Sequence, residues 1–284
     1  MARDPSSSST RRPTRVTESR SWHALETAGE ALALQARVLH TLLLREMRAT
    51  FGKTQLGYLW AILVPALGMS ILMLVFSLAG RQPPYGHSFA LFFATGLLVL
   101  EHFRKMSSSL MSGIEANRAL LVYPRIGALD VLAARAMLVS ATYAVIFAIF
   151  FGGLRIAGLA PLPHDPATLV VAFAVGAWLG AGIGVVNASL VGIWDGWRHV
   201  EKVLTRPLIF LSGIFYVPSV LPEAFRDVLW WNPVLHVVEW TRAAFYPIYP
   251  QEILTPWYPV AIGTGMMLLG LLLEHATRHS RTLA

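Results

Sequence analysis

The sequence predicts an all-α integral membrane protein with six transmembrane helices, an N-terminal amphipathic helix at the membrane surface, and re-entrant extracellular half-helices between the fifth and sixth spans. Of its 284 residues, 55% are hydrophobic and 14% are charged, whereas about a quarter are charged in soluble domains. The apolar residues form uninterrupted runs. One of them, 56–79, contains 24 residues without a charge, which is enough for a helix to cross a hydrocarbon core.

Six apolar runs define the expected spans. Four of them are long, namely 56–79, 128–154, 167–193 and 257–273. Two are weaker: the second span begins near Ser88, and the fifth covers about 203–217, which is short for a full crossing unless its flanks contribute. The spans form one transmembrane domain over 56–274, which is followed by a cytoplasmic tail, 275–284.

The positive charges indicate how the chain is oriented. Nineteen of the 23 Lys and Arg residues lie in the two terminal segments and in the two loops that six crossings place on the same side. By the positive-inside rule this side is the cytoplasm, so both termini are predicted to be cytoplasmic. The net charge of +7 therefore follows the topology, and we expect no nucleic-acid partner.

The segments before the first span have two different characters. Residues 1–30 predict a disordered cytoplasmic tail because they are rich in Ser, Thr and Arg and lack the apolar core of a signal peptide, although a mitochondrial transit peptide has a similar composition. In 31–55, leucines recur at helical spacing beside cations, which indicates an amphipathic interfacial helix. This helix either anchors the first span or forms a gate at a cytoplasmic entrance. The cations of such a gate are Arg37, Arg45, Arg48 and Lys53.

Charged residues interrupt the second span. In one interpretation the helix ends near residue 100 and the charges lie in water. In the other it continues, and Glu101 lies about 20 Å along the helix from Ser88, inside a core about 30 Å thick. Ionisable groups at such depth are usually functional. The spacing of Glu101, Arg104 and Lys105 places them on one helix face, so they either neutralise one another or form an anion site in a channel.

Small residues recur in the fourth span. Gly176, Gly180 and Gly184 follow one another at every fourth position. Small side chains let helices approach closely within lipid, so these glycines predict a helix-packing face. Its partner is either another span of this chain or a second copy of it.

The segment 218–247 is too charged and too rich in proline to span a membrane. It reads as two half-helices, about 223–231 and 234–245, that are joined at Asn232 and Pro233 and re-enter the membrane from outside. Its aromatic residues form either an interfacial belt or an exit whose rings stack on sugars. The candidate aromatic channel residues are Tyr216, Trp230, Trp231, Trp240 and Tyr246.

Motifs for catalysis, nucleotides and metals are weak. Gly52, Lys53 and Thr54 resemble the end of a phosphate-binding loop, but Met47 occupies the position of its first glycine. His275 and His279 lie one helical turn apart without an obvious third ligand. We therefore expect a chain that is not an enzyme and that has no catalytic residue, cofactor or metal of its own.

Three stretches together carry a family resemblance. Residues 42–67, LLLREMRATFGKTQLGYLWAILVPAL, look like the opening of type 2 ABC exporter permeases. Residues 106–135 are similar to the second span and the cytoplasmic coupling segment of the branch that exports capsular polysaccharide, and NPVLHVVEWTRAAF, 232–245, resembles the re-entrant half-helices of that branch. The similarity covers most of 32–278.

The resemblance implies a permease in the bacterial inner membrane that exports a lipid-linked, anionic polysaccharide. Two copies of the chain would work with two copies of a separate ATPase, which binds ATP and Mg²⁺, and with periplasmic and outer-membrane proteins that carry the polymer onward. It also implies that the segment 114–130 docks on the ATPase, although an ordinary loop would have a similar composition. The residues expected to couple the two proteins are Asn117, Arg118, Tyr123, Pro124, Arg125 and Asp130.

Other functions fit parts of the sequence. A permease for O-antigen, teichoic acid or a drug would share the fold. An integral membrane glycosyltransferase would need carboxylates or histidines clustered at one membrane face, and those of the 218–252 region are scattered. A membrane scaffold without transport would not need charges at the depth of a span.

Overall fold

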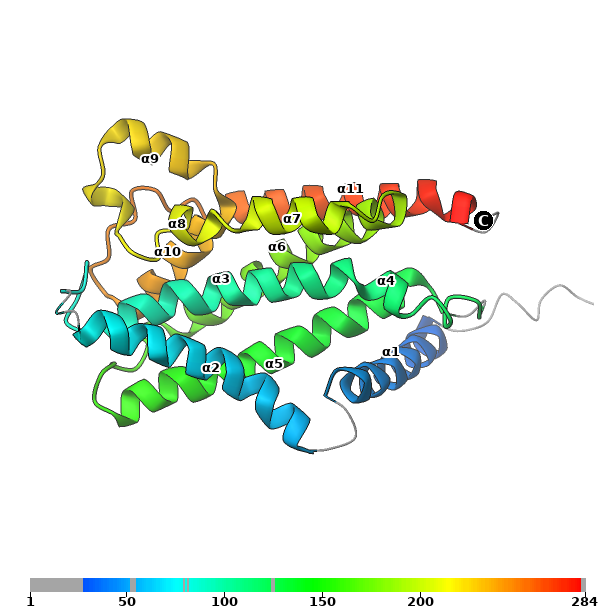
Figure 1. Cartoon of the computed structure of the whole chain (residues 1–284), viewed down its shortest axis with the longest axis horizontal. Helices are drawn as coiled ribbons and strands as arrows, with labels where there is room; N and C mark the ends of the chain where they lie inside the picture. The colour runs from blue at the N-terminus through cyan, green and yellow to red at the C-terminus, as the bar shows by residue number, and fades with distance from the viewer. Residues whose placement is uncertain (1–27, 52–54, 79, 81, 124–125, 282–284) are drawn as a thin grey trace, which may run out of the picture. The chain divides into compact units, whose positions relative to one another are not determined.

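The computed structural model describes residues 28–51, 55–78, 80, 82–123 and 126–281, and every regular element within these ranges is helical. The chain divides into two compact units, 1–37 and 38–284, so the helix α1 contributes to both. In chain order the α-helices are α1 (Ala28–Phe51), α2 (Gln55–Leu78), α3 (Phe89–Met111), α4 (Gly113–Ala116), α5 (Ala128–Ile156), α6 (Pro166–Ile193), α7 (Trp197–Thr205), α8 (Leu208–Leu211), α9 (Glu223–Trp230), α10 (Pro233–Phe245) and α11 (Trp257–Arg281) (Figure 1).

Three helices of the described residues are long and apolar enough to cross a membrane. They are α5, α6 and the part of α11 that covers Trp257–Ala276. Helix α3 has a suitable length of 23 residues but contains Glu101, Arg104 and Lys105. The helix continues through these charges to Met111, which agrees with the second of the two interpretations of this segment.

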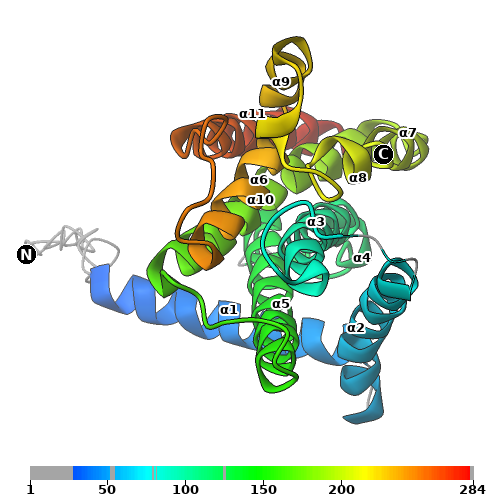
Figure 2. The same cartoon turned by 90° about the vertical axis from the view of Figure 1, so that its left-hand side faces the viewer.

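Helix α6 lies at the centre of the second unit and packs against α3, α10 and α11 (Figure 2). Close approach explains its glycines. A Cβ atom at Gly180 would lie 2.9 Å from Cβ of Met106 on α3, and one at Gly176 would lie 3.2 Å from a methyl carbon of Val237 on α10. Gly184 faces Leu110 of α3 in the same way.

Capping residues determine where several helices begin. The Ser88 hydroxyl accepts a hydrogen bond from the Leu91 N–H at the start of α3, and the Asn232 side chain accepts one from the Val234 N–H at the start of α10. Asp165 caps α6, and the hydrogen bond that the Thr168 hydroxyl donates to it holds the pKa of the Asp165 carboxyl below its ordinary value. The break between α9 and α10 therefore falls at Asn232 and Pro233, where the sequence predicted it.

The fifth apolar run, about 203–217, was predicted as one span, but the structure divides it into shorter pieces. Helix α7 ends at Thr205, α8 covers only Leu208–Leu211, and a turn follows in which Gly213 has a φ of +70°. Pro207 has no N–H to continue the hydrogen-bond ladder, and the left-handed backbone at position 213 favours glycine. The run is therefore divided into short pieces.

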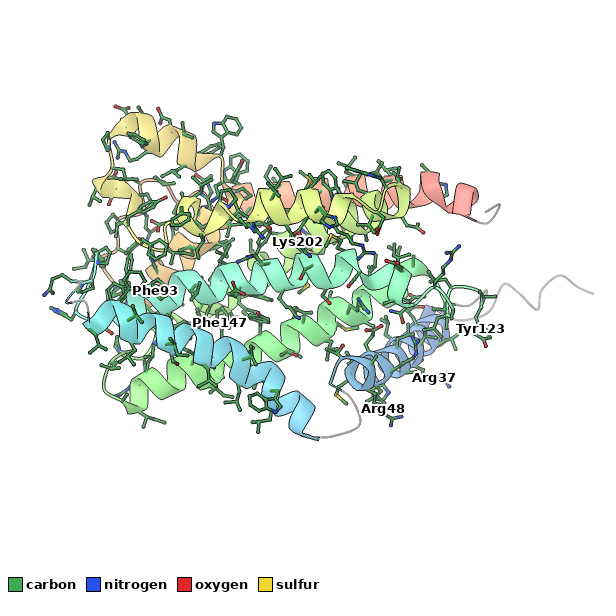
Figure 3. The ribbon with its side chains drawn as sticks, viewed as in Figure 1. Arg37, Arg48, Phe93, Tyr123, Phe147 and Lys202 are labelled. Atoms are coloured by element: carbon green, nitrogen blue, oxygen red, sulfur yellow. The ribbon has the colours of Figure 1, made fainter. Side chains whose placement is uncertain are left out.

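The second unit has two distinct ends, at which different segments gather. The coupling segment with α4 and Tyr123 lies at one end, and α9 and α10 lie at the other (Figures 1 and 3). At the α9 and α10 end, the Asp165 N–H donates to the Ala244 carbonyl, and the Tyr258 hydroxyl donates to the Trp231 carbonyl. Phe93 and Phe147 belong to the core cluster between these ends.

The contact between Gly182 of α6 and α11 provides a test of helix packing. Gly182 is not part of the repeat of Gly176, Gly180 and Gly184. A Cβ atom there would lie 2.3 Å from the carbonyl oxygen of Gly263 on α11, so Gly182→Ala must separate the two helices. We expect a loss of about 1–3 kcal/mol in the free energy of unfolding, measured by thermal denaturation in detergent. The control is Gly153→Ala on α5, where no other atom lies within 4 Å. Equal stability of both variants would contradict this packing.

Candidate functional site

A polar cavity of about 710 Å³ lies between the end of α1, α2, α3 and α5. The hydroxyl groups of Ser108, Ser109 and Thr142 contribute to its lining, and Trp60 and Val64 of α2 form an apolar wall. The remaining lining residues are Glu46, Thr50, Glu101, Lys105, Ser112, Arg135, Leu138, Val139 and Tyr143. Hydroxyl groups beside an aromatic ring can hydrogen-bond and stack on a sugar, and the cations can bind an anion.

The three charged residues predicted either to neutralise one another or to form a channel site have different neighbours. Glu101 and Arg104 form an ion pair of 3.2 Å in which both side chains remain more than a third exposed. Lys105 lines the cavity together with Glu101, whereas Arg104 does not.

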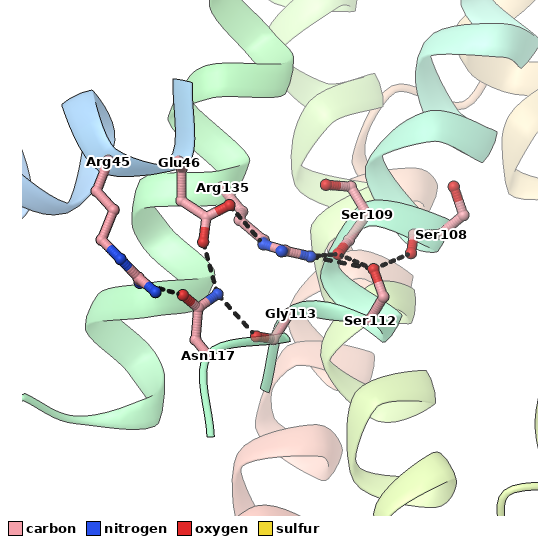
Figure 4. A network of polar contacts seen from close by, with 8 residues as sticks. All are labelled: Arg45, Glu46, Ser108, Ser109, Ser112, Gly113, Asn117 and Arg135. Carbon is pink, nitrogen blue, oxygen red and sulfur yellow. Dashed lines mark hydrogen bonds and ion pairs between the residues drawn. The ribbon is translucent and has the colours of Figure 1, made fainter. Parts of the chain in front are cut away.

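The carboxylate of Glu46 joins the entrance helix α1 to the rest of the second unit (Figure 4). Glu46 is only 3% exposed. One of its oxygens accepts a hydrogen bond of 2.5 Å from the amide nitrogen of Asn117, and the other pairs with Nε of Arg135 at 3.0 Å. A buried carboxylate is stable only when it is paired and hydrogen-bonded, and both conditions are met here.

Asn117 and Arg135 extend this network. Asn117 accepts a hydrogen bond of 2.5 Å from Arg45 and donates one of 3.1 Å to the Gly113 carbonyl. Arg135 donates to the carbonyl of Ser109 at 2.9 Å and to the hydroxyl of Ser112 at 3.0 Å. The network therefore connects α1, the end of α3, the coupling segment and α5 at one wall of the cavity.

The coupling segment is held from a second direction by α7. Glu115 of α4 pairs with Arg198, which also pairs with Asp195 at 2.9 Å. The hydrogen bond from Arg198 to Asp195 raises the pKa of the guanidinium. Behind this contact, the indole nitrogen of Trp197 donates to the Asn187 side chain on α6 at 2.9 Å. A movement of α4 would consequently change the contacts of this segment with α1 and with α7.

Asn117 was predicted to contact an ATPase, which requires an exposed side chain, but its side chain is buried. Its side chain is 2% exposed and faces α1, because its amide satisfies the buried carboxylate of Glu46. Arg118 and Tyr123 are exposed, and Asp130 accepts a hydrogen bond of 2.8 Å from the Gly127 N–H at the start of α5. The predicted contacts Pro124 and Arg125 lie outside the described residues.

The predicted cations of the entrance helix have different environments. Arg48 is exposed, whereas Arg45 bonds to Asn117. The Nε of Arg37, which belongs to the first unit, donates to the Ala33 carbonyl at 3.3 Å. Lys53 lies outside the described residues, as do residues 1–27 of the predicted tail.

The predicted aromatic channel residues divide into two clusters. Trp230 packs against Trp231 and Tyr258 at the start of α10, and Tyr246 packs against Tyr85 and Tyr249 after its end. Trp240 is half-buried within α10. The Tyr216 hydroxyl donates to the Phe210 carbonyl at 3.0 Å, which closes the turn after α8.

A buried ion pair between these clusters was not anticipated from the sequence. Arg242 is fully buried, pairs with Glu239 at 3.1 Å and lies 3.7 Å above the ring of Phe92 on α3. It also donates to the Tyr216 carbonyl at 3.3 Å, so it fixes α10 against α3 and the turn after α8. The sequence did contain one indication of this pair, because Glu239 and Arg242 carry opposite charges three residues apart in a predicted half-helix.

A metal site needs several side chains of His, Cys, Asp or Glu that converge on one point. In the part of the chain that the structure describes, no three such side chains gather in this way.

The Glu46 network predicts strong coupling between two distant positions. Glu46→Ala leaves the largely buried Arg135 without its partner, so we expect a loss of about 3 kcal/mol in the free energy of unfolding. A double-mutant cycle with Arg135→Ala, followed by denaturation in detergent, should give a coupling energy of about 1–3 kcal/mol. The exposed pair of Glu115 and Arg198 is the matched control and should lose less than about 1 kcal/mol. Additive effects of Glu46→Ala and Arg135→Ala would exclude the coupling.

Comparisons with known proteins agree with this architecture over most of the chain. The polysialic acid transport protein KpsM of Escherichia coli is 30% identical over 246 residues, which are 87% of this chain and 95% of that protein. The capsule polysaccharide export inner-membrane protein CtrC of Neisseria meningitidis serogroup A is 26% identical, with coverage of 85% and 91%. BexB of Haemophilus influenzae, a capsule polysaccharide export inner-membrane protein, is 23% identical, with coverage of 86% and 92%.

A family model gives the same result independently of single relatives. The model for the ABC-2 type transporter matches residues 37–246, which include the entrance helix from Arg37, the cavity, the coupling segment and the half-helices α9 and α10. The matched region is more than half of the chain. The chain therefore belongs to the ABC-2 type transporter family of membrane proteins.

Proposed function

We propose that this chain is the permease subunit of an ABC transporter that exports a capsular polysaccharide across the inner membrane. The observation that carries the proposal is the similarity to three capsule or polysialic acid transport proteins over 85–87% of the chain. Transport in such a system is driven by a separate ATPase. The chain itself supplies the membrane path.

The cavity beside Lys105 is the place in this path where the polymer or its lipid head group first binds. Lys105 supplies a positive charge for a phosphate or carboxylate, and Ser108, Ser109 and Thr142 supply hydroxyl groups for a sugar. Trp60 offers a ring on which a sugar can stack. An anionic polysaccharide matches this combination better than an apolar drug does.

The coupling segment is the proposed contact with the ATPase. Arg118, Val122 and Tyr123 are exposed there, and Val122 is a large apolar side chain at 81% exposure. An exposed apolar residue between charged and aromatic neighbours is typical of an interface. Asn117 and Glu115 then carry the movement of this segment to α1 and α7 through the bonds described above.

The proposal includes a topology of six crossings with both termini in the cytoplasm. Helices α2, α3 and the α7–α8 region supply the crossings beyond α5, α6 and α11, and α9 with α10 form the re-entrant extracellular region. Either a second copy of the chain or lipid covers the exposed apolar side chains of α2, such as Val64 and Ile71. Periplasmic and outer-membrane proteins receive the polymer.

Deletion of the gene tests the function, and two variants test the site. In the deletion strain we expect polysaccharide to accumulate in the cytoplasm, measured by staining surface and cytoplasmic fractions separately. The variant Lys105→Gln should lower surface polymer by about tenfold or more, because a charge-assisted hydrogen bond contributes roughly 1.5–3 kcal/mol. Lys202→Gln on α7 is the control for charge and should export normally.

Two results would contradict these expectations. Unchanged surface polymer in the deletion strain would mean that the chain transports another substrate. Normal export by Lys105→Gln, at a normal level of protein in the membrane, would remove Lys105 from the path while leaving the export function intact.

A further inference from the structure

A second cavity, of about 1050 Å³, lies at the α9 and α10 end of the second unit. It is bounded by the C-terminal half of α2, the start of α3, the end of α5 and the residues after α10. None of its lining residues belongs to the polar cavity beside Lys105. It is therefore a separate site, near the opposite end of the same helices α2, α3 and α5.

Most of the lining of this second cavity is apolar. Leu74 comes from α2, Leu91 from α3, and Phe150 and Leu154 from α5. The loop after α5 adds Leu159, Ala160 and Pro161. A surface of this kind binds hydrocarbon well and a polysaccharide poorly, because a sugar would lose its hydrogen bonds with water there. The occupant must therefore bring an apolar chain.

The groups that can bind an anion are confined to one part of the lining. Arg155, the last basic residue of α5, and His87, just before α3, both line the cavity. The first turn of α3, with Ser88, Phe89 and Ala90, lies beside them, and the N-terminus of a helix carries partial positive charge. In the described part of the chain no acidic residue lines this cavity. The charged region therefore favours an anion.

Tyr246 adds an unsatisfied donor. Its hydroxyl is buried and finds no hydrogen-bond partner within the described residues, although such groups are almost always paired. A Cβ atom at Gly86 would lie 3.4 Å from this hydroxyl oxygen, and Gly86 and Tyr246 both line the cavity. An acceptor oxygen that entered the cavity would satisfy the hydroxyl.

We propose that this cavity binds one anionic phospholipid, with an acyl chain along Leu74, Leu91 and Phe150 and with its phosphate group between Arg155, His87 and the start of α3. The phosphate and ester oxygens of the lipid provide an acceptor for the buried Tyr246 hydroxyl and an anionic partner for the exposed Arg155. The apolar wall and the localised cationic part match the two halves of such a molecule. This site does not depend on which substrate the transporter exports.

Native mass spectrometry of the purified full-length protein tests the site. The protein is incubated in detergent with phosphatidylglycerol or with phosphatidylethanolamine, and the retained lipids are counted. We expect one phosphatidylglycerol to bind at least about tenfold more tightly than phosphatidylethanolamine, and Arg155→Gln to remove that preference. Arg226→Gln is the matched control, because Arg226 is also an arginine at the α9 and α10 end but pairs with Glu252 instead.

A second variant tests the apolar half without a change of charge. Ser70→Trp places a large ring in the cavity from α2 and should lower the retention of phosphatidylglycerol by a similar factor. Soluble glycerol phosphate should not displace the lipid. Unchanged retention in both Arg155→Gln and Ser70→Trp, or full displacement by glycerol phosphate, would overturn the proposal. A thermal melt of each variant verifies that it remains folded.

Discussion

The buried carboxylate of Glu46 is the constraint on which the rest of this structure depends. A carboxylate that is 3% exposed needs a cation and hydrogen-bond donors, and its partners come from two other segments of the chain. Arg135 belongs to α5, and Asn117 belongs to the coupling segment. Helix α1 is consequently tied to α5 and to the segment 114–130 by polar bonds, and not by apolar contact alone.

The same network also forms part of the wall of the cavity beside Lys105. Arg135 and Glu46 both line the cavity beside Lys105, so a displacement of Asn117 would change the wall of that cavity directly. The pair of Glu115 and Arg198 transmits the same displacement to α7. The segment 114–130 is therefore attached both to α1 and to α7.

The sequence predicted those features that depend on neighbouring residues. The division of α9 from α10 follows from Asn232 and Pro233. The sequence left open whether α3 ends near residue 100, and the structure shows that it continues to Met111. The close packing of Gly180 was accessible from the repeat of small residues. In contrast, the fifth run was predicted as one helix, because hydrophobicity alone does not show the effect of Pro207 and Gly213.

The features that could not be predicted from the sequence depend on contacts between residues that are far apart along the chain. Glu46 lies 71 residues from Asn117 and 89 residues from Arg135, and no local spacing reveals such a contact. The sequence therefore indicated Asn117 as a surface contact, although its side chain is turned inward. The different neighbours of Arg104 and Lys105 also required the structure, because only Lys105 lines the cavity while Arg104 pairs with Glu101.

The most direct test of this account is the coupling of ATP hydrolysis to export in the variant Asn117→Leu, which keeps the side-chain volume but removes the amide. In the complex reconstituted with its ATPase, the account predicts normal ATPase binding and continued ATP hydrolysis, together with a loss of export of about tenfold, because breaking hydrogen bonds to a charged group costs roughly 1.5–3 kcal/mol. Normal export would contradict the role of the Glu46 network. Loss of ATPase binding would also contradict it, because Asn117 would then belong to the docking surface itself.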